Sequence, residues 1–491
     1  MRPIPAIFRC LQNGRQAAIK EICVVIKSIS GRLHPVKRSY EQLDIYFNQV
    51  KNKISPPQLV TAIFIILILA GTVLLSLPHA AEDGESVGFL NAFFTATSAV
   101  CVNGLIVMDT GSSFSHLGEV VIMLLIQVGG LGFMTMGVMV AIILGRKIGL
   151  KQRLILQQTT QSTSVQGLVR LSLHMVAISF VLETAAAIIL ALRWQGELGW
   201  GRAFYYGIFH AVSAFNNAGF SLWHDSLSRH IGDPVVNLTI TLLFLTGGLG
   251  FIVVVEVLRK RSWRKLSLHS KVVLLGSAIL TLLGFLLVFL LESWNPATFG
   301  NLSWPERLLA AFFQGSAPRS AGFNSIEIGQ MLSATQFLTI ILMFIGAASG
   351  GTGGGIKINT FIVLVLATFN TFRGGGQIHA FGRKINQETV MRALAVTMSA
   401  IAGVLIVTMA LTITEDLMHE QFLSILFESV SAFSTTGMSM GLTPELSPAG
   451  KMIVTITMFA GRLGPLTLAY ALSQKKRVSK IGYPEDNILI G

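Results

Sequence analysis

The chain has 491 residues, a formal net charge of +13 and 52% hydrophobic residues, but only 12% charged residues. Soluble globular proteins carry about twice that charged fraction (~25%), and the mean hydropathy here is +0.65. A string of soluble domains and a disordered chain are therefore excluded, and three scattered cysteines rule out a disulfide scaffold or a zinc site. The composition is that of an integral membrane protein.

The basic residues predict how the chain is oriented in the membrane. Thirty of the 37 Lys and Arg residues fall in five segments, whereas acidic residues such as Asp109, Asp225 and Glu327 lie in the loops between them; the basic segments are 1–57, 146–171, 259–271, 357–392 and 473–491. The positive-inside rule places these segments and both termini in the cytoplasm. Basic charge distributed in this way indicates contact with membrane lipid and no nucleic-acid partner. The first apolar run begins only near Leu59, so no cleaved signal peptide is expected.

The apolar runs have two lengths, which predicts an all-α membrane protein. A spanning helix needs about 20 residues, and eight runs reach that length: 58–77, 117–145, 168–192, 235–258, 271–291, 336–369, 389–413 and 449–472. Taken in order, the eight long runs form four consecutive pairs. Between the two runs of each pair lies a run too short to span the membrane, which predicts a re-entrant half-helix; these short runs are 89–99, 204–214, 306–316 and 421–432. We therefore expect eight transmembrane helices plus four re-entrant pore half-helices, in four helix–pore–helix repeats around one pore.

The four predicted repeats also share a short sequence. SAVCVNGL (98–105), SAFNNAGF (213–220), SAPRSAGF (316–323) and SAFSTTGM (431–438) each open with Ser-Ala and reach a glycine six residues later. A phenylalanine stands ten residues before each glycine, at positions 94, 209, 312 and 427. Chance similarity among apolar segments would not keep these offsets without gaps. The repeats are predicted at 58–145, 168–258, 271–372 and 389–472, after a cytoplasmic basic segment 1–57 and before a cytoplasmic tail 473–491.

A half-helix followed by a glycine-containing strand suits a cation pore. The carboxyl end of a helix carries partial negative charge, and glycine allows successive carbonyl oxygens to face one axis. A ring of carbonyl oxygens can then replace the hydration shell of a cation. The residues predicted to bind the ion, called the selectivity filter below, are Val102, Asn103, Gly104, Asn217, Ala218, Gly219, Ser320, Ala321, Gly322, Thr435, Thr436 and Gly437.

The second helix of each pair carries glycines of its own. GGLGF occurs at 129–133 and 247–251, GRLGP stands at 461–465, and the third repeat has GAASGGTGGGIK at 346–357. Close helix packing is the simpler interpretation of GGLGF, but the glycine content of 346–357 predicts an unwound intramembrane loop. That loop lacks the lysine spacing of a phosphate-binding loop. Arg462 lies inside a predicted span, where it either faces the pore or pairs with backbone carbonyls or an acid. Below the filter we expect a gate formed by Gly350, Gly351, Gly353, Gly354, Gly355, Lys357 and Arg462.

Two further features allow more than one interpretation. Arg319 in the third filter strand and Glu428 in the fourth half-helix either form a buried pair or make separate backbone contacts. Segment 1–57 mixes apolar and basic residues at helical spacing, so it could be an interfacial helix, a docking surface or a solvated tail.

These motifs resemble the Trk/Ktr/HKT superfamily of cation transporters. TSAVCVNGL, IQVGGLGFMT, SAFNNAGFS, RSAGFNS, STTGMSMGLT and the tail YPEDNILIG are similar to the bacterial Ktr-type potassium-translocating subunit in particular. In this family, a serine in place of the first filter glycine is associated with sodium preference. This chain has Gly104 at that position, so the resemblance implies potassium selectivity. Family members often have a threonine where this chain has Asn103. It also implies a homodimer on a cytoplasmic ring of nucleotide-binding (ATP/ADP or NAD) regulatory subunits. The loop 346–357 and Arg462 are implied as the gate.

The function expected from the sequence is potassium uptake across the bacterial inner (plasma) membrane, with no enzyme activity. Potassium is the transported ion and no cofactor is bound permanently; sodium stimulation is left open. The alternative is a secondary cation transporter with alternating access. Such proteins typically use inverted repeats, whereas the repeats here run parallel.

Overall fold

The computed structural model describes residues 56–143, 165–375, 377–415 and 421–464. All of them belong to one compact unit that begins at Pro56. The tail 473–491 and segment 1–57, apart from its last two residues, lie outside the described residues, so the three interpretations of that segment are not addressed.

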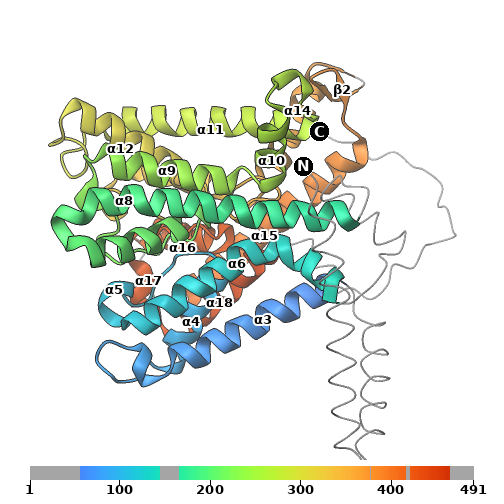
Figure 1. The fold of residues 1–491 in the computed structure, drawn as a ribbon. Coiled ribbons are helices and arrows are strands. Elements are labelled where there is room, and N and C mark those ends of the chain that lie inside the picture. Colours follow the sequence, from blue (N-terminus) through green and yellow to red (C-terminus); the bar gives the residue numbers. More distant parts are fainter. Residues whose placement is uncertain (1–55, 144–164, 376, 416–420, 465–491) are drawn as a thin grey trace, which may run out of the picture. The chain divides into compact units, whose positions relative to one another are not determined.

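Each predicted repeat corresponds to a set of neighbouring helices in the structure (Figure 1). The first repeat holds α3 (Pro56–Leu75), α4 (Phe89–Val100) and α6 (His116–Ile143), and the second holds α8 (Val165–Phe215), α9 (Pro234–Gly248) and α10 (Phe251–Lys260). The third holds α11 (Leu268–Glu292), α12 (Trp304–Ser316), α13 (Ser333–Phe344) and α14 (Ile358–Phe372), and the fourth holds α15 (Gln387–Thr414), α16 (Phe422–Ser434) and α18 (Pro448–Leu463). Short helices α5 (Thr110–Ser113) and α17 (Leu442–Glu445) and a hairpin of β1 (His379–Ala380) and β2 (Arg383–Lys384) complete the named elements used below.

The helices pack within each repeat and then around a closed ring. In the first repeat α3, α4 and α6 contact one another, and in the fourth repeat α15, α16 and α18 do the same. Successive repeats meet through α6 and α8, then α9 and α12, then α13 and α16. Finally α18 contacts α4, which joins the last repeat to the first. The four repeats therefore surround one axis in their order along the chain.

Three breaks interrupt the long helices. Gly199 has a non-helical backbone (φ 73°) inside α8 and separates a long first part from the half-helix that ends at Phe215. The pair α9 and α10 bends by 99° at Gly250, and α13 and α14 are separated by the loop 345–357. The first GGLGF, at 129–133, instead lies inside the continuous helix α6. One five-residue sequence thus adopts two conformations.

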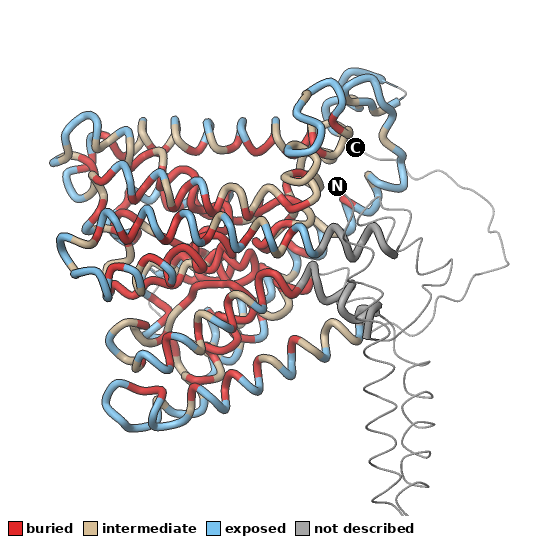
Figure 2. The backbone as a smooth tube through the Cα atoms, viewed as in Figure 1, coloured by how far each residue is buried: buried red, intermediate tan, exposed pale blue. Residues whose placement is uncertain are grey.

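The outer helices present apolar side chains to their surroundings, as membrane proteins do. Ile66 on α3, Leu290 on α11 and Ile406 on α15 are 63%, 65% and 69% exposed, whereas the interior along the axis is buried (Figure 2). Within the described residues four helices are long and apolar enough to span a bilayer, or five when α9 and α10 count as one span. The chain is a helical multi-pass membrane protein, while the count of eight spans remains a prediction.

Candidate functional site

The segments after the four half-helices share one backbone conformation. The glycine of each has a positive φ, and so does the residue two positions before it. The φ angles are 54° and 94° at Val102 and Gly104, 60° and 71° at Asn217 and Gly219, 77° and 77° at Ser320 and Gly322, and 48° and 86° at Thr435 and Gly437. Positive φ is rare for residues with a side chain, so its recurrence at the same register four times identifies four equivalent strands.

The four glycines form a narrow closed ring. A side chain added at Gly104 would meet the carbonyl oxygen of Ala218, and one added at Gly219 would lie 2.6 Å from the Cα of Gly322. At Gly322 it would lie 2.5 Å from the carbonyl oxygen of Thr436, and at Gly437 it would meet the carbonyl oxygen of Asn103. Each strand therefore contacts the next, and the fourth contacts the first. The four glycines and the residue before each of them, among the residues predicted from the sequence, come together in this ring.

The carbonyl oxygens of these strands have no partner among the described residues. No hydrogen bond there uses the carbonyl oxygen of any residue in 102–104, 217–219, 320–322 or 435–437. Their side chains are buried, with Asn103, Asn217, Ser320 and Thr436 all 0% exposed. Buried backbone oxygens are almost always paired, so twelve unpaired ones around one axis are suited to a cation.

The serine of the shared Ser-Ala pair holds the strand in three repeats. Ser98 Oγ accepts from the Gly104 amide at 3.1 Å and donates to the Leu105 carbonyl at 2.7 Å. Ser213 Oγ donates to the Phe220 carbonyl at 2.8 Å, and Ser431 Oγ accepts from the Gly437 amide at 3.1 Å. The repeated serine therefore fixes the distance between the end of the half-helix and the filter glycine.

The third repeat departs from this arrangement. Ser316 Oγ donates to the Phe312 carbonyl, one turn back in its own helix, instead of contacting its strand. The phenylalanine is also displaced by one position, since Phe313 is fully buried and Phe312 is only half-buried. At the shared Phe position, the third repeat therefore has a less buried side chain than the other three repeats.

Arg319 anchors the third strand in a different way. Its guanidinium donates to the Ser277 carbonyl at 3.0 Å, to Ser277 Oγ at 3.2 Å and to Thr281 Oγ1 at 2.9 Å, all on α11. Glu428 accepts instead from Ser439 Oγ at 2.9 Å and from Thr443 Oγ1. The alternative of a buried Arg319–Glu428 pair is therefore wrong, and separate contacts are the correct interpretation.

The glycine-rich loop of the third repeat lies directly against the strands. Its two ends are tied by hydrogen bonds from the Gly346 amide to the Ile356 carbonyl (3.0 Å) and from the Ile356 amide to the Phe344 carbonyl (3.2 Å). Between these ends, a side chain added at Gly353 would lie 2.5 Å from Ser320 Cβ, and one added at Gly354 would meet Thr435 Oγ1. The loop therefore occupies the space next to the third and fourth strands.

The same loop is bound to the break between α9 and α10. The Ala348 amide donates to the Gly248 carbonyl at 2.9 Å, and the Thr352 amide donates to the Gly247 carbonyl at 3.2 Å. In return the Phe251 amide donates to the Gly350 carbonyl at 3.1 Å. The loop supplies the partners that the bent helix has lost, which explains why GGLGF is broken in the second repeat and helical in the first.

Arg462 joins the loop to the first repeat. Its guanidinium donates to the Thr352 carbonyl and, at 2.9 Å, to the Gly129 carbonyl on α6. Lys357 Nζ donates to the Gly353 carbonyl at 2.5 Å, within the loop. The sequence prediction grouped these two cations correctly with the loop. It missed Thr352, whose Oγ1 also donates to Asn217 Oδ1 in the second strand at 2.9 Å.

The glycines of the second helices pack against the ends of the half-helices. A side chain at Gly129, Gly247 or Gly461 would meet the carbonyl oxygen of Val100, Phe215 or Phe433, respectively. Each of these carbonyls belongs to the residue two positions after the repeated serine. Close helix packing, the simpler interpretation of the motif, is therefore confirmed at all three positions.

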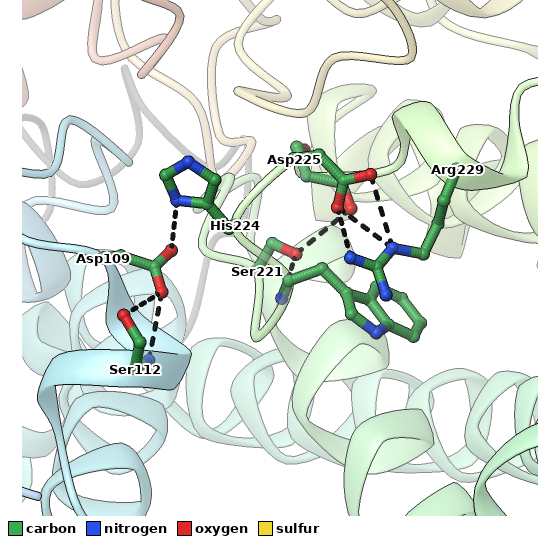
Figure 3. A network of polar contacts seen from close by, with 8 residues as sticks. Asp109, Ser112, Ser221, His224, Asp225 and Arg229 are labelled. Carbon is green, nitrogen blue, oxygen red and sulfur yellow. Dashed lines mark hydrogen bonds and ion pairs between the residues drawn. The ribbon is translucent and has the colours of Figure 1, made fainter.

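Polar side chains join the loops that follow the first and second strands (Figure 3). Asp109 Oδ1 lies 3.6 Å from His224 Nδ1, and its other oxygen accepts from the Ser112 amide at 3.0 Å. Arg229 donates to Asp225 at 2.8 and 3.0 Å. Partial burial would raise the pKa of Asp225, but the hydrogen bonds and the charge of Arg229 hold that pKa below its usual value. Asp109 thus places a negative charge beyond the first strand, which favours cations, whereas the charge of Asp225 is balanced by that of Arg229.

Comparison with known proteins agrees with this geometry. The chain matches the TrkH family model, described as a cation transport protein, over residues 37–480. It is 44% identical to Ktr system potassium uptake protein B of Bacillus subtilis, over 89% of this chain and 97% of that protein. It is 38% identical to the potassium/sodium uptake protein NtpJ of Enterococcus hirae, over 91% of this chain and 100% of that protein.

A solved structure has a similar fold. The potassium transporter TrkH from Vibrio parahaemolyticus superposes with a TM-score of 0.65 at 19% sequence identity, over 84% of each chain. The conserved arrangement of helices and the sequence matches lead to the same assignment. The chain belongs to the TrkH family of cation transport proteins.

Proposed function

We propose that this chain carries potassium into the cell through a pore lined by the backbone carbonyl oxygens of 102–104, 217–219, 320–322 and 435–437. The observation that carries the proposal is the closed ring of Gly104, Gly219, Gly322 and Gly437. Around it lie twelve carbonyl oxygens that accept no hydrogen bond among the described residues. Carbonyl oxygens in such a ring replace the water around a potassium ion.

The half-helices add to the attraction for a cation. Helices α4 and α16 and the last part of α8 end within two residues of a filter strand, and α12 ends four residues before one. The carboxyl end of a helix carries roughly half a negative charge. Four such ends directed at one site stabilise a cation there without a charged side chain.

The loop 345–357 and Arg462 form the gate in this proposal. The loop contacts the second, third and fourth strands through Thr352, Gly353 and Gly354, and Arg462 links it to Gly129 in the first repeat. A loop held by all four repeats obstructs the path below the filter. Opening requires the hydrogen bonds of Thr352 and Arg462 to break, and the glycines of 346–357 give the loop the freedom to move.

We also propose a topology and an assembly for this chain. We assign eight spans and four half-helices in four parallel repeats, both termini in the cytoplasm, and a location in the bacterial inner membrane. The relatives are named as parts of a Ktr system, which supports an assembly with partner subunits. For this chain we propose a homodimer acting with a cytoplasmic, nucleotide-binding ring of regulatory subunits. Sodium stimulation would act through this assembly.

Potassium uptake in living cells tests the function. The chain is expressed in a bacterium that lacks its own potassium uptake systems, with and without a nucleotide-binding regulatory subunit, at low external potassium. We expect saturable uptake that prefers potassium to sodium, with the regulatory subunit changing its rate. A protein that inserts normally but supports no potassium uptake in either condition would refute the proposal.

A further inference from the structure

A basic cavity lies at the end of the molecule opposite the filter loops. It has a volume of about 640 Å³ and is lined by two segments far apart in the sequence. One segment runs from the end of α10 to the start of α11 and contributes Lys260, Lys265, Ser267 and Leu268. The other is strand β2, which consists of Arg383 and Lys384. Figure 1 shows α10, α14 and β2 together at this end.

Ring contacts hold the two segments side by side. The rings of Trp263, on the connection, and Phe381, in the hairpin turn, lie 6.3 Å apart in an edge-to-face arrangement. Lys271 on α11 places its Nζ 5.9 Å from the centroid of the same Phe381 ring. The cavity therefore exists only in the folded chain, because these contacts bring the cations of one segment close to those of the other.

Most of the positive charge in the cavity is not neutralised by the protein. Lys260 pairs with Glu256 at 2.5 Å. Among the described residues no carboxylate lies within ion-pair distance of Lys265, Arg383 or Lys384. Three exposed cations that share one cavity repel one another, so a bound anion would stabilise this arrangement.

The surroundings of the cavity are those of a membrane–water interface. Leu268, in its lining, is the first residue of α11, which continues as a 25-residue apolar helix. Trp263 and Phe381 are each 47% exposed, and Leu258 on α10 is 56% exposed. Aromatic side chains are enriched where a protein leaves the hydrocarbon core. A ligand here would therefore have its anion in the cavity and its apolar part along α11.

We propose that this cavity binds the phosphodiester headgroup of an anionic phospholipid, with Lys265, Arg383 and Lys384 as its ligands. Basic pockets at the cytoplasmic ends of spanning helices bind anionic headgroups by charge and hydrogen bonding. The guanidinium of Arg383 can contact two phosphate oxygens at once. The bound lipid would tie the connection between α10 and α11 to the hairpin after α14, and so join the second repeat to the third.

Lipid retention on the purified chain tests this proposal. Native mass spectrometry counts the phosphatidylglycerol molecules that stay bound as the lipid is titrated, with phosphatidylcholine as the neutral comparison. Each cation near an anionic surface changes the affinity about fivefold, so Lys265→Gln/Arg383→Gln/Lys384→Gln should weaken phosphatidylglycerol binding roughly 100-fold. The single variant Arg383→Gln should show a smaller loss in the same direction.

The control removes the same charge from the same connection. Arg259→Gln/Arg261→Gln/Arg264→Gln changes three cations that do not line the cavity, and it should retain the lipid like the unchanged chain. Equal losses in the two triple variants would overturn the proposal in favour of diffuse attraction. Displacement of the lipid by millimolar inorganic phosphate would show that the ligand is not a lipid. The proposal would also be overturned if the triple variant of Lys265, Arg383 and Lys384 kept its lipid and lost only the binding of a cytoplasmic protein partner. Because binding is measured without transport, this outcome is independent of the pore.

Discussion

Removing the side chain of Arg462 should raise the potassium flux. The guanidinium donates at least two hydrogen bonds to backbone carbonyls, one in the loop at Thr352 and one on α6 at Gly129. A hydrogen bond to a charged group contributes about 1.5–3 kcal/mol, so the closed arrangement loses up to about 3–6 kcal/mol in Arg462→Ala. The loop keeps its three backbone hydrogen bonds to the α9–α10 break, which limits the effect.

We expect at least a tenfold increase in uptake per molecule in the membrane, which corresponds to about 1.4 kcal/mol. The assay measures initial rates of potassium or rubidium uptake in cells that lack other uptake systems, normalised to the amount of inserted protein. Unchanged or lower uptake by Arg462→Ala, at equal thermal stability in detergent, would refute the gating argument.

Two further variants separate the causes. Arg462→Lys keeps the charge but cannot reach both carbonyls with a planar fork, so uptake like that of Arg462→Ala assigns the effect to the hydrogen bonds, and unchanged uptake assigns it to the charge. Thr352→Val leaves the backbone carbonyl in place and removes the bond from Oγ1 to Asn217 Oδ1, together with the longer contact of 3.4 Å to the Phe215 carbonyl. A neutral hydrogen bond contributes about 1 kcal/mol, so we expect roughly a fivefold increase.

Three other changes test the filter and its supports. Gly104→Ser should lower the preference for potassium over sodium in competition uptake, because φ is 94° and the new side chain meets the next strand; an unaltered ratio would place selectivity elsewhere. Arg319→Gln should lower the same preference, and Ser277→Ala, which removes one of the three hydrogen bonds of Arg319, should lower it more weakly. A fall in stability with unchanged selectivity would show that Arg319 has a structural role only. Gly129→Ala should lower the midpoint of thermal unfolding, because the added Cβ meets a half-helix carbonyl. In Gly196→Ala the added Cβ has no atom within 4 Å, so the midpoint should rise or stay the same. Equal effects of the two substitutions would contradict the packing argument.

The fourfold repeat was predictable because its signal is local. A serine and a glycine six residues apart mark the end of every half-helix in the sequence, and in three repeats the serine joins the half-helix to its strand. The proposed pore chemistry also uses backbone groups, which depend little on the side chains around them. The repeated positive φ at the glycine and two residues before it lies where the sequence places the four strands.

What the sequence could not determine depends on contacts between repeats. GGLGF is helical at 129–133 and broken at 247–251 because only the second copy meets the amides of Ala348 and Thr352. Arg319 could be matched with an acid by charge alone, yet its partners are Ser277 and Thr281 on α11. Such choices are set by three-dimensional packing, so short sequence motifs do not reveal them.

The closed ring also constrains how the protein is made. The junction of the last repeat with the first brings Gly437 against Gly104, Asn103 Nδ2 to 3.0 Å from the Ala432 carbonyl, and Arg462 onto Gly129. These partners are separated by more than 300 residues, so the junction closes only after most of the chain has been synthesised. Until then the ends of the half-helices and the strand carbonyls lack their ring, and contacts between such distant residues form slowly. The ring is consequently completed late in biogenesis, and a chain that stops before the fourth strand at 435–437 would insert helices without closing it.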